Sequence, residues 1–252
     1  MARGGHRLGK RLLKIGAAAG LAAALVSAPC HASGLQVDPV AVTITGRSGT
    51  LWLSNLGDAP LQSQIRVYQW GQDGHADVLS PTVELLASPP MAAIETNGRQ
   101  LVRLVAPNPK SCEDAYRLAI DEVPPMLPAG TSPVAGLHYV LHYSVPVFVT
   151  ARGCAKIRPE LTWQLLRNDT GIALIVTNQG AMHAQLAGLH FVTAKGNPVD
   201  VTPGLLGYVL PGQTRTFNFP IAPGTLAGAN TLELAVNGSH VSQPLVLGTI
   251  GR

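Results

Sequence analysis

The chain has 252 residues, of which 46% are hydrophobic and 13% charged, with 27 glycines and 20 prolines. This composition excludes a disordered chain, and the absence of a Gly-X-Y period excludes collagen. Five of the 18 basic residues precede residue 15, so 13 remain against 14 acidic residues, and the formal charge of +4 gives no support to nucleic-acid binding.

The first 32 residues predict a secretory signal peptide. A basic stretch precedes the apolar segment 15–26, and a run of small residues then ends at Ala32, the expected cleavage point. The apolar segment is too short for a comfortable membrane span, so we expect an exported protein without a stable membrane anchor.

Short alternating or β-branched runs, separated by Gly, Pro, Asn and Asp, fill the rest of the chain. They predict strands at 37–45, 49–54, 62–70, 101–105, 116–123, 137–149, 161–166, 172–177, 184–193, 207–210, 214–219 and 231–236. Asn237-Gly238 favours a type I′ turn and predicts a last hairpin with 241–247. No segment after the leader has a sustained helical period, so we expect a nearly all-β protein.

The number and spacing of these strands predict two β-sandwiches in tandem rather than one. The segment 150–159 carries three basic residues, a glycine and a proline, as a linker does. We therefore expect an N-terminal domain at 33–150, a linker at 151–158 and a C-terminal domain at 159–252. Each is long enough to bury a core of its own.

The predicted strand 137–149 is the most informative segment. Its alternation places one row of large side chains on a single face: Leu137, Tyr139, Leu141 and Tyr143. Taken alone, such a row is typical of a strand that faces its own core. On the opposite face, His138 and His142 lie about 13 Å apart along the strand, which is too far for one metal ion, so we expect no metal site.

The two cysteines that follow the leader are expected to pair. The strand 116–123 is the predicted antiparallel partner of 137–149, so Cys112 precedes one strand and Cys154 follows the other. In such a hairpin these two positions lie close together. Because an exported chain meets an oxidising compartment, we expect a Cys112–Cys154 disulfide.

Several short motifs, in this order and spacing, resemble the periplasmic chaperones of the chaperone–usher pilus-assembly pathway. They are Val37-Asp38-Pro39, Leu53-Ser54-Asn55, Ala87-Ser88-Pro89-Pro90, Tyr116-Arg117-Leu118, Glu122-Val123-Pro124-Pro125, Val145-Pro146-Val147-Phe148 and Asn237-Gly238-Ser239. The ending from Tyr143 to Phe148 is similar to the archaic branch, which handles spore-coat-protein-U-like subunits. The resemblance implies two immunoglobulin-like domains and a periplasmic location.

The resemblance also implies a mechanism. A pilus subunit lacks its last strand, and the chaperone lends one of its own before the subunit passes to an outer-membrane usher. The donor residues implied here are Leu137, Tyr139 and Leu141, with Tyr143 as a fourth. No cofactor, metal or enzymatic activity is implied, and the chain is expected to be a monomer when free or one-to-one with a subunit.

The sequence departs from the family where the subunit's C-terminal carboxylate is bound. The family uses an Arg on the first strand and a Lys on the long strand, and these positions hold Ala41 and Pro146 here. Arg117, on the adjacent strand, is our first candidate for the carboxylate anchor, and Arg152 in the linker is the second. A solvated or structurally paired arginine is the alternative for each.

Arg103 and Glu113 fall where the family places a structural ion pair near the domain junction. We expect this pair to orient the two domains, with a solvent-exposed pair of little energetic value as the alternative.

Two other classes of function stay open. An exported structural or adhesive sandwich, such as a pilin, would share the leader and the strand spacing, but it would polymerise with copies of itself. An exported enzyme would need convergent polar groups, and the sequence has no carboxylate pair, phosphate loop or Cys/His nucleophile arrangement that stands out.

Overall fold

The computed structural model describes residues 34–124, 139–154, 157–168, 171–193, 196–226, 229–244 and 247–249, which belong to one compact unit. The predicted signal peptide and the predicted donor residue Leu137 lie outside the described residues. Within the part of the chain that is described, no helix is long and apolar enough to cross a membrane.

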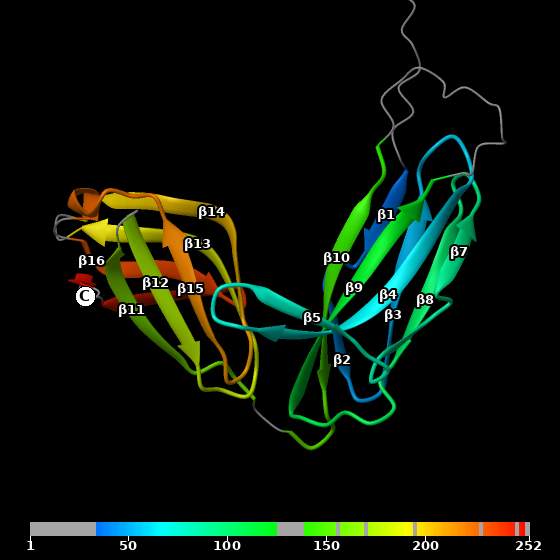
Figure 1. Cartoon of the computed structure of the whole chain (residues 1–252), viewed down its shortest axis with the longest axis horizontal. Helices are drawn as coiled ribbons and strands as arrows, with labels where there is room; N and C mark the ends of the chain where they lie inside the picture. The colour runs from blue at the N-terminus through cyan, green and yellow to red at the C-terminus, as the bar shows by residue number, and fades with distance from the viewer. Residues whose placement is uncertain are drawn as a thin grey trace, which may run out of the picture. The chain divides into compact units, whose positions relative to one another are not determined.

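The first half of the chain forms a sandwich of two sheets (Figure 1). Sheet A contains, in spatial order, β1 (Leu35–Asp38), β3 (Ser48–Asn55), β8 (Arg99–Val105) and β6 (Leu86–Ser88). Sheet B contains β2 (Val42–Thr45), β10 (His142–Thr150), β9 (Glu113–Val123), β4 (Leu61–Gln72) and β5 (Asp77–Pro81), and β7 (Met91–Ile94) also pairs with β4.

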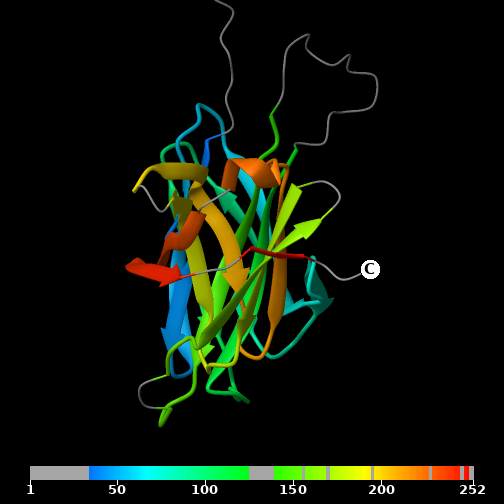
Figure 2. The same ribbon diagram turned by 90° about the vertical axis from the view of Figure 1, so that its left-hand side faces the viewer.

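The second half forms another sandwich, whose strands can also be followed in Figure 2. Sheet C contains β15 (Thr214–Phe219), β12 (Gly171–Asn178), β11 (Leu161–Asn168) and β18 (Leu247–Thr249). Sheet D contains β14 (Pro198–Val209), β13 (Ala184–Thr193), β16 (Ala229–Val236) and β17 (Ser239–Pro244). A 3-10 helix, η1 (Pro223–Leu226), precedes β16. The expectation of two tandem immunoglobulin-like sandwiches is confirmed.

Local sequence explains where the chain turns. Asn237 and Gly238 both have positive φ, at 49° and 79°, and they join β16 to β17 as the Asn-Gly pair predicts. The expected single strand 37–45 is wrong, because the chain breaks at Pro39, after a cis Asp38–Pro39 bond, and passes from sheet A to sheet B. Proline has no N–H to give to a ladder, which makes it suited to such a crossing.

Each sandwich buries its own apolar core, and alternation decides which side chains enter it. Leu51 and Leu53 are fully buried, whereas Trp52 between them faces outward. The second core gathers around Phe191 and Leu174. A third, smaller cluster joins the two sandwiches: Trp70, Ala115 and Phe148 of sheet B pack with Tyr208 and Leu210.

Each sandwich has a buried corner built in the same way around one asparagine. In the first, the side-chain amide of Asn55, fully buried, donates to the carbonyls of Ala59 and Ile94, and its oxygen accepts from the N–H of Gly57. In the second, Asn178 repeats the arrangement with Met182, Val209 and Gly180. Each asparagine satisfies backbone groups that the turn after its strand would otherwise leave unpaired.

Candidate functional site

One side of β10 is only partly paired. Along 142–150 the strand pairs with β9, but on its other side β2 reaches only Val147–Thr150. Among the described residues, no strand pairs with this second side of His142–Pro146. We call it the open side of β10. An unpaired row of N–H and C=O groups is a template for a further strand.

The predicted donor residues differ in how they lie next to the open side. Tyr139 is 58% exposed, and Val140 beside it is exposed as well. Leu141 and Tyr143 are partly buried against the first core, and the Tyr143 hydroxyl donates to the carbonyl of Leu35 at 2.7 Å. The alternation of the row is therefore present, but its later members rest on the protein's own core.

A charged cluster lies on the opposite face of the same strands. The Asp121 carboxylate accepts from Arg66 at 2.7 Å and also contacts His142 Nδ1 on β10. Burial raises the pKa of Asp121, but the hydrogen bonds from His142 and Arg66 outweigh it and hold that pKa below its usual value.

Arg117, the first candidate anchor, lies on β9 directly across from Pro146. Its guanidinium carbon is 3.7 Å from the centroid of the Trp70 ring, and its side chain is only 15% exposed. The guanidinium contacts Asp77 and the carbonyl of Ser144, both at 3.4 Å. Burial lowers the pKa of Arg117, and Asp77 opposes this shift, but an arginine remains charged throughout.

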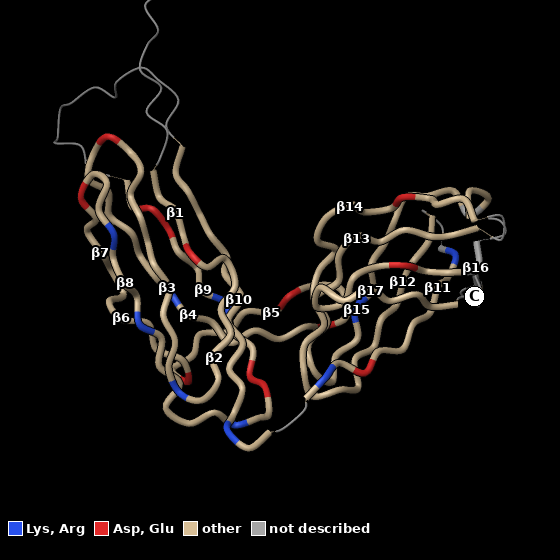
Figure 3. The backbone as a smooth tube through the Cα atoms, turned by 180° about the vertical axis from the view of Figure 1, so that it is seen from behind, with Lys and Arg blue, Asp and Glu red and all other residues tan. Residues whose placement is uncertain are grey.

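A second arginine, Arg215 on β15, reaches the same carboxylate. Its Nη1 lies 3.4 Å from Asp77 Oδ1, and its side chain is 14% exposed. Within the described residues, neither Nε nor Nη1 of Arg215 has a hydrogen-bond partner. Two buried guanidinium groups thus share one carboxylate, which leaves a net positive charge. We call Arg117, Arg215 and Asp77 the arginine cluster; Figure 3 shows the basic and acidic positions along the backbone.

The second candidate anchor, Arg152, is not part of the arginine cluster. It follows the far end of β10 and is exposed, with its guanidinium beside Gly46. Together with Arg47, Ser48 and Pro109 it lines a cavity of about 510 Å³. The structure therefore separates the two candidates rather than bringing them together.

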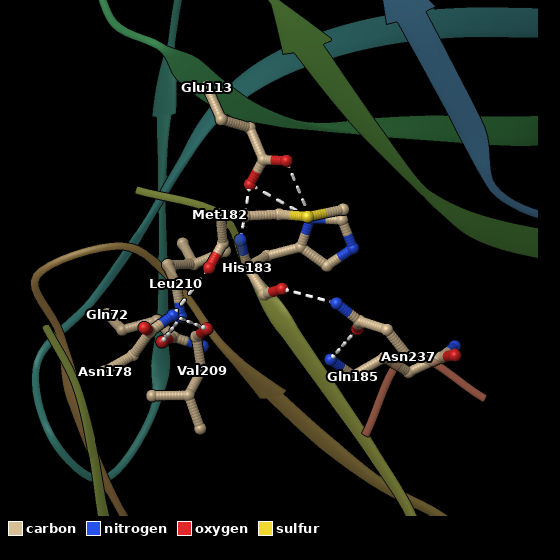
Figure 4. Close-up of polar contacts among 9 residues, drawn as sticks. All are labelled: Gln72, Glu113, Asn178, Met182, His183, Gln185, Val209, Leu210 and Asn237. Carbon is tan, nitrogen blue, oxygen red and sulfur yellow. Dashed lines mark hydrogen bonds and ion pairs between the residues drawn. The ribbon is translucent and has the colours of Figure 1, made fainter. Parts of the chain in front are cut away.

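The expected ion pair between Arg103 and Glu113 is wrong. Arg103 is exposed on sheet A, whereas Glu113 begins β9 in sheet B and is buried. Glu113 accepts instead from the backbone N–H of His183 at 2.6 Å, and both its oxygens lie 2.9 Å from His183 Nδ1 (Figure 4).

The His183 ring also stacks on Phe148 of β10, with ring centroids 3.4 Å apart. Gln72 adds a second link between the sandwiches, because its amide donates to the carbonyl of Tyr208 and accepts from the N–H of Leu210. These contacts hold the end of β10 against the second sandwich. Sequence reasoning missed His183 and Arg215, since their partners lie in the other sandwich and no local pattern marks them.

The expected Cys112–Cys154 disulfide is confirmed, with the two Cα atoms 5.4 Å apart. It joins the start of β9 to the turn after β10, and the N–H of Ala151 donates to the carbonyl of Cys112 beside it. The disulfide therefore fixes the paired end of β10 and leaves the end with the open side untouched.

Comparisons with known proteins agree with this architecture. Residues 34–154 match the family model described as pili and flagellar-assembly chaperone, PapD N-terminal domain. No curated protein sequence matches the chain.

Solved structures show the same fold. A chain of the CsuC–CsuE chaperone–tip adhesion subunit pre-assembly complex from the archaic chaperone-usher Csu pili of Acinetobacter baumannii has 24% identity and a TM-score of 0.62, over 86% of this chain and 99% of that one. A chain of the Salmonella enterica SafA pilin–SafB chaperone complex has 22% identity and a TM-score of 0.61, over 85% and 97%. The E. coli chaperone DraB has 16% identity and a TM-score of 0.58, over 85% and 97%.

Proposed function

We propose that the chain is a PapD-like pilus-assembly chaperone, and that it captures a pilus or fimbrial subunit in the periplasm on the open side of β10. The observation that carries this proposal is a half-paired strand that follows the exposed Tyr139 and the partly buried Leu141. Chaperones of this family are periplasmic, and the proposed role is binding and delivery to an outer-membrane usher rather than catalysis.

Capture follows from the physics of an incomplete sandwich. A subunit that lacks its last strand exposes an apolar groove and an unpaired edge, and both promote aggregation. The backbone of β10 would complete the subunit's ladder, while Leu137, Tyr139 and Leu141 fill the groove. Each fully buried anchor stabilises such a complex by about 1.5–3 kcal/mol. Tyr143 contributes less to subunit binding, since its hydroxyl is hydrogen-bonded to the carbonyl of Leu35.

We further propose that the arginine cluster binds the subunit's C-terminal carboxylate. The family's two basic positions are Ala41 and Pro146 here, but Arg117 lies across from Pro146, and Arg215 supplies a second guanidinium. A carboxylate bound at the arginine cluster would meet two largely buried cations and one competing anion, Asp77. The exposed Arg152 is the weaker candidate.

Co-expression with the candidate subunit tests strand donation. The wild-type chain should purify as a soluble one-to-one complex by native mass, and Tyr139→Asp and Leu141→Asp should abolish the complex while circular dichroism stays native. Leu205→Asp, which places the same charge at an exposed leucine of the second sandwich, is the matched control and should leave the complex intact. Full binding by Tyr139→Asp and Leu141→Asp would overturn the proposal.

A subunit with an amidated C-terminus tests the anchor. Arg117→Ala and Arg215→Ala should each weaken binding of the natural subunit, by about 1.5–3 kcal/mol for a charge-assisted hydrogen bond. Neither should change binding of the amidated subunit. Arg158→Ala removes an exposed arginine of the proposed linker and serves as the control. Equal losses with both subunits would assign the two arginines a structural role only.

The signal-peptide cleavage point and the domain boundaries are also proposals. We propose cleavage after Ala32, a first domain at 33–150, a linker at 151–158 and a second domain at 159–252. The mass of the periplasmic protein tests the cleavage point, and limited proteolysis should cut first within the linker. The alternative of a self-polymerising surface protein is not favoured. A series of multimers of the chain alone, detected by native mass, would support that alternative.

A further inference from the structure

A cavity of about 510 Å³ lies at the end of the first sandwich where β10 stops. Two turns line this cavity: the turn between β2 and β3, and the turn that follows β10. We call it the Arg152 pocket, and its lining consists of residues 45–48, Pro109 and residues 151–152. Its volume is within the range of small-molecule binding sites.

The backbones of both turns are held in place. The N–H of Gly46 donates to the carbonyl of Thr150, which ties the first turn to the end of β10. The N–H of Ala106 donates to the carbonyl of Arg47. The disulfide bridges the turn that contains Arg152 to the start of β9. Because these backbones are already ordered, a ligand bound between them would cost little conformational entropy.

The side chain of Arg152 lies directly against the backbone of Gly46. A Cβ at Gly46 would stand 3.1 Å from Arg152 Nε and 3.7 Å from its Nη2. Gly46 also has a φ of 100°, a conformation that side chains rarely adopt. Glycine at this position therefore gives the guanidinium of Arg152 its place at the edge of the cavity.

The Arg152 pocket carries positive charge without a counter-ion of its own. Among the residues that the structure describes, neither Arg47 nor Arg152 forms an ion pair, and no acidic side chain lines the cavity. Exposure to solvent does not explain this difference, because the exposed Arg66 and Arg158 each contact a carboxylate.

The acidic residues of the neighbouring segments have other partners. Asp114 accepts from the N–H of Lys110, and Glu84 pairs with the Lys110 side chain at 2.8 Å. Glu113 is hydrogen-bonded to His183. The two guanidinium groups of the Arg152 pocket are therefore left for an anion that comes from outside the chain.

We propose that the Arg152 pocket binds a phosphate group, carried by a small phosphomonoester or by a lipid headgroup. A phosphate ester has up to two negative charges and three oxygens, which match two guanidinium groups and the hydroxyls of Thr45 and Ser48 in the same lining. A carboxylate has one charge and two oxygens, so it would use these donors less fully. The cavity is larger than a phosphate alone, which leaves room for a short organic arm.

The Arg152 pocket is separate from the proposed subunit site. The open side begins at His142, and about 26 Å of strand lies between this residue and Thr150, the last residue of β10. A phosphate bound in the Arg152 pocket should therefore not compete with a subunit on the open side. Phosphate binding can be measured on the free chain, whether or not subunit capture occurs.

Isothermal titration calorimetry of the purified chain with glycerol 3-phosphate at low salt tests the proposal. We expect saturable one-to-one binding. Arg47→Gln and Arg152→Gln should each weaken it about tenfold or more, as the loss of a charge-assisted hydrogen bond predicts. Arg167→Gln changes an exposed arginine of the second sandwich in the same way, so it is the matched control and should bind like wild type.

Gly46→Ala tests the placement of Arg152 separately from its charge. The added Cβ should displace the guanidinium and weaken binding of glycerol 3-phosphate several-fold, although every charge of the pocket is kept. Circular dichroism of each variant verifies that it is folded.

Vesicles distinguish the two sources of the phosphate group. Co-sedimentation with phosphatidylcholine vesicles that contain phosphatidic acid, lost in Arg152→Gln, would identify a lipid headgroup. Binding of glycerol 3-phosphate without binding to these vesicles would identify a free phosphomonoester.

Three results would overturn the proposal. The first is the absence of saturable binding to both probes, and the second is wild-type affinity in a variant that combines Arg47→Gln with Arg152→Gln. The third is equal affinity for acetate, or loss of glycerol 3-phosphate binding in a one-to-one subunit complex verified by native mass. In that last case Arg152 would belong to the subunit site instead.

Discussion

The same buried asparagine corner occurs in both sandwiches, but the edges of the two sandwiches differ. Asn55 at the end of β3 and Asn178 at the end of β12 make the same pattern of three hydrogen bonds. Beyond that corner, and within the described residues, only the first sandwich combines a half-paired strand, β10, with a disulfide. The asparagine corner stabilises a turn in both sandwiches, whereas the half-paired strand β10, which we propose binds a subunit, belongs to the first sandwich.

The two ends of β10 in the first sandwich are also held differently. The disulfide and the contacts of Glu113 with His183 fix the paired end of β10, while the end with the open side carries the exposed Tyr139. A rigid anchor next to an available edge keeps the proposed donor segment aligned at little entropic cost.

Removal of the disulfide should produce the largest difference between the two sandwiches. Replacing Cys112 and Cys154 together by Ser should destabilise the first sandwich by about 4 kcal/mol, because the bridge closes a loop across 42 positions. Calorimetry should show the transition of the first sandwich lowered and that of the second unchanged. An equal shift in both would contradict the assignment of the bridge to one domain.

The shared corner can be tested from both sides. Asn55→Ala and Asn178→Ala should each cost about 3 kcal/mol in their own sandwich, since each leaves buried backbone groups without partners. Denaturant unfolding of the two variants measures the costs. A neutral result for either one would show that the two corners are alike in geometry only.

Removing a charge at the contact between the two sandwiches should cost less stability than removing either asparagine. Glu113→Gln should cost about 2 kcal/mol, because the acceptor for the His183 N–H loses its charge in a buried setting. Glu160→Gln, which weakens the exposed pair with Arg158, should stay within about 0.5 kcal/mol of wild type. Thermal unfolding of both variants decides whether burial sets the difference.

The smallest expected effect is an acid dependence confined to the first sandwich. Because the folded-state pKa of Asp121 is lowered, its contribution to stability is complete above the ordinary Asp value of about 3.9 and is lost as the pH falls through the folded value. The stability gap between wild type and Asp121→Asn should therefore close on acidification below about pH 4. A gap that stays constant down to pH 2 would contradict this sign.

Sequence patterns predicted what depends on local order. They identified the hairpin at Asn237-Gly238, the pairing of β9 with β10, and the disulfide, because turn chemistry and alternation act over short distances. They did not predict Arg215, His183 or the true partner of Glu113, since those contacts depend on how one sandwich packs against the other. Alternation also placed Leu141 and Tyr143 in the exposed row without indicating that both rest on the first core.

Hydrogen exchange of the chaperone–subunit complex tests strand donation most directly. Amides of 139–145 whose N–H groups point to the open side should gain protection when the subunit binds, whereas those of 147–150, already paired on both sides, should change little. That result would place the subunit's edge on the open side of β10. Protection that appears instead on β5 or β17, with the open-side amides of 139–145 still exchanging freely, would contradict the account.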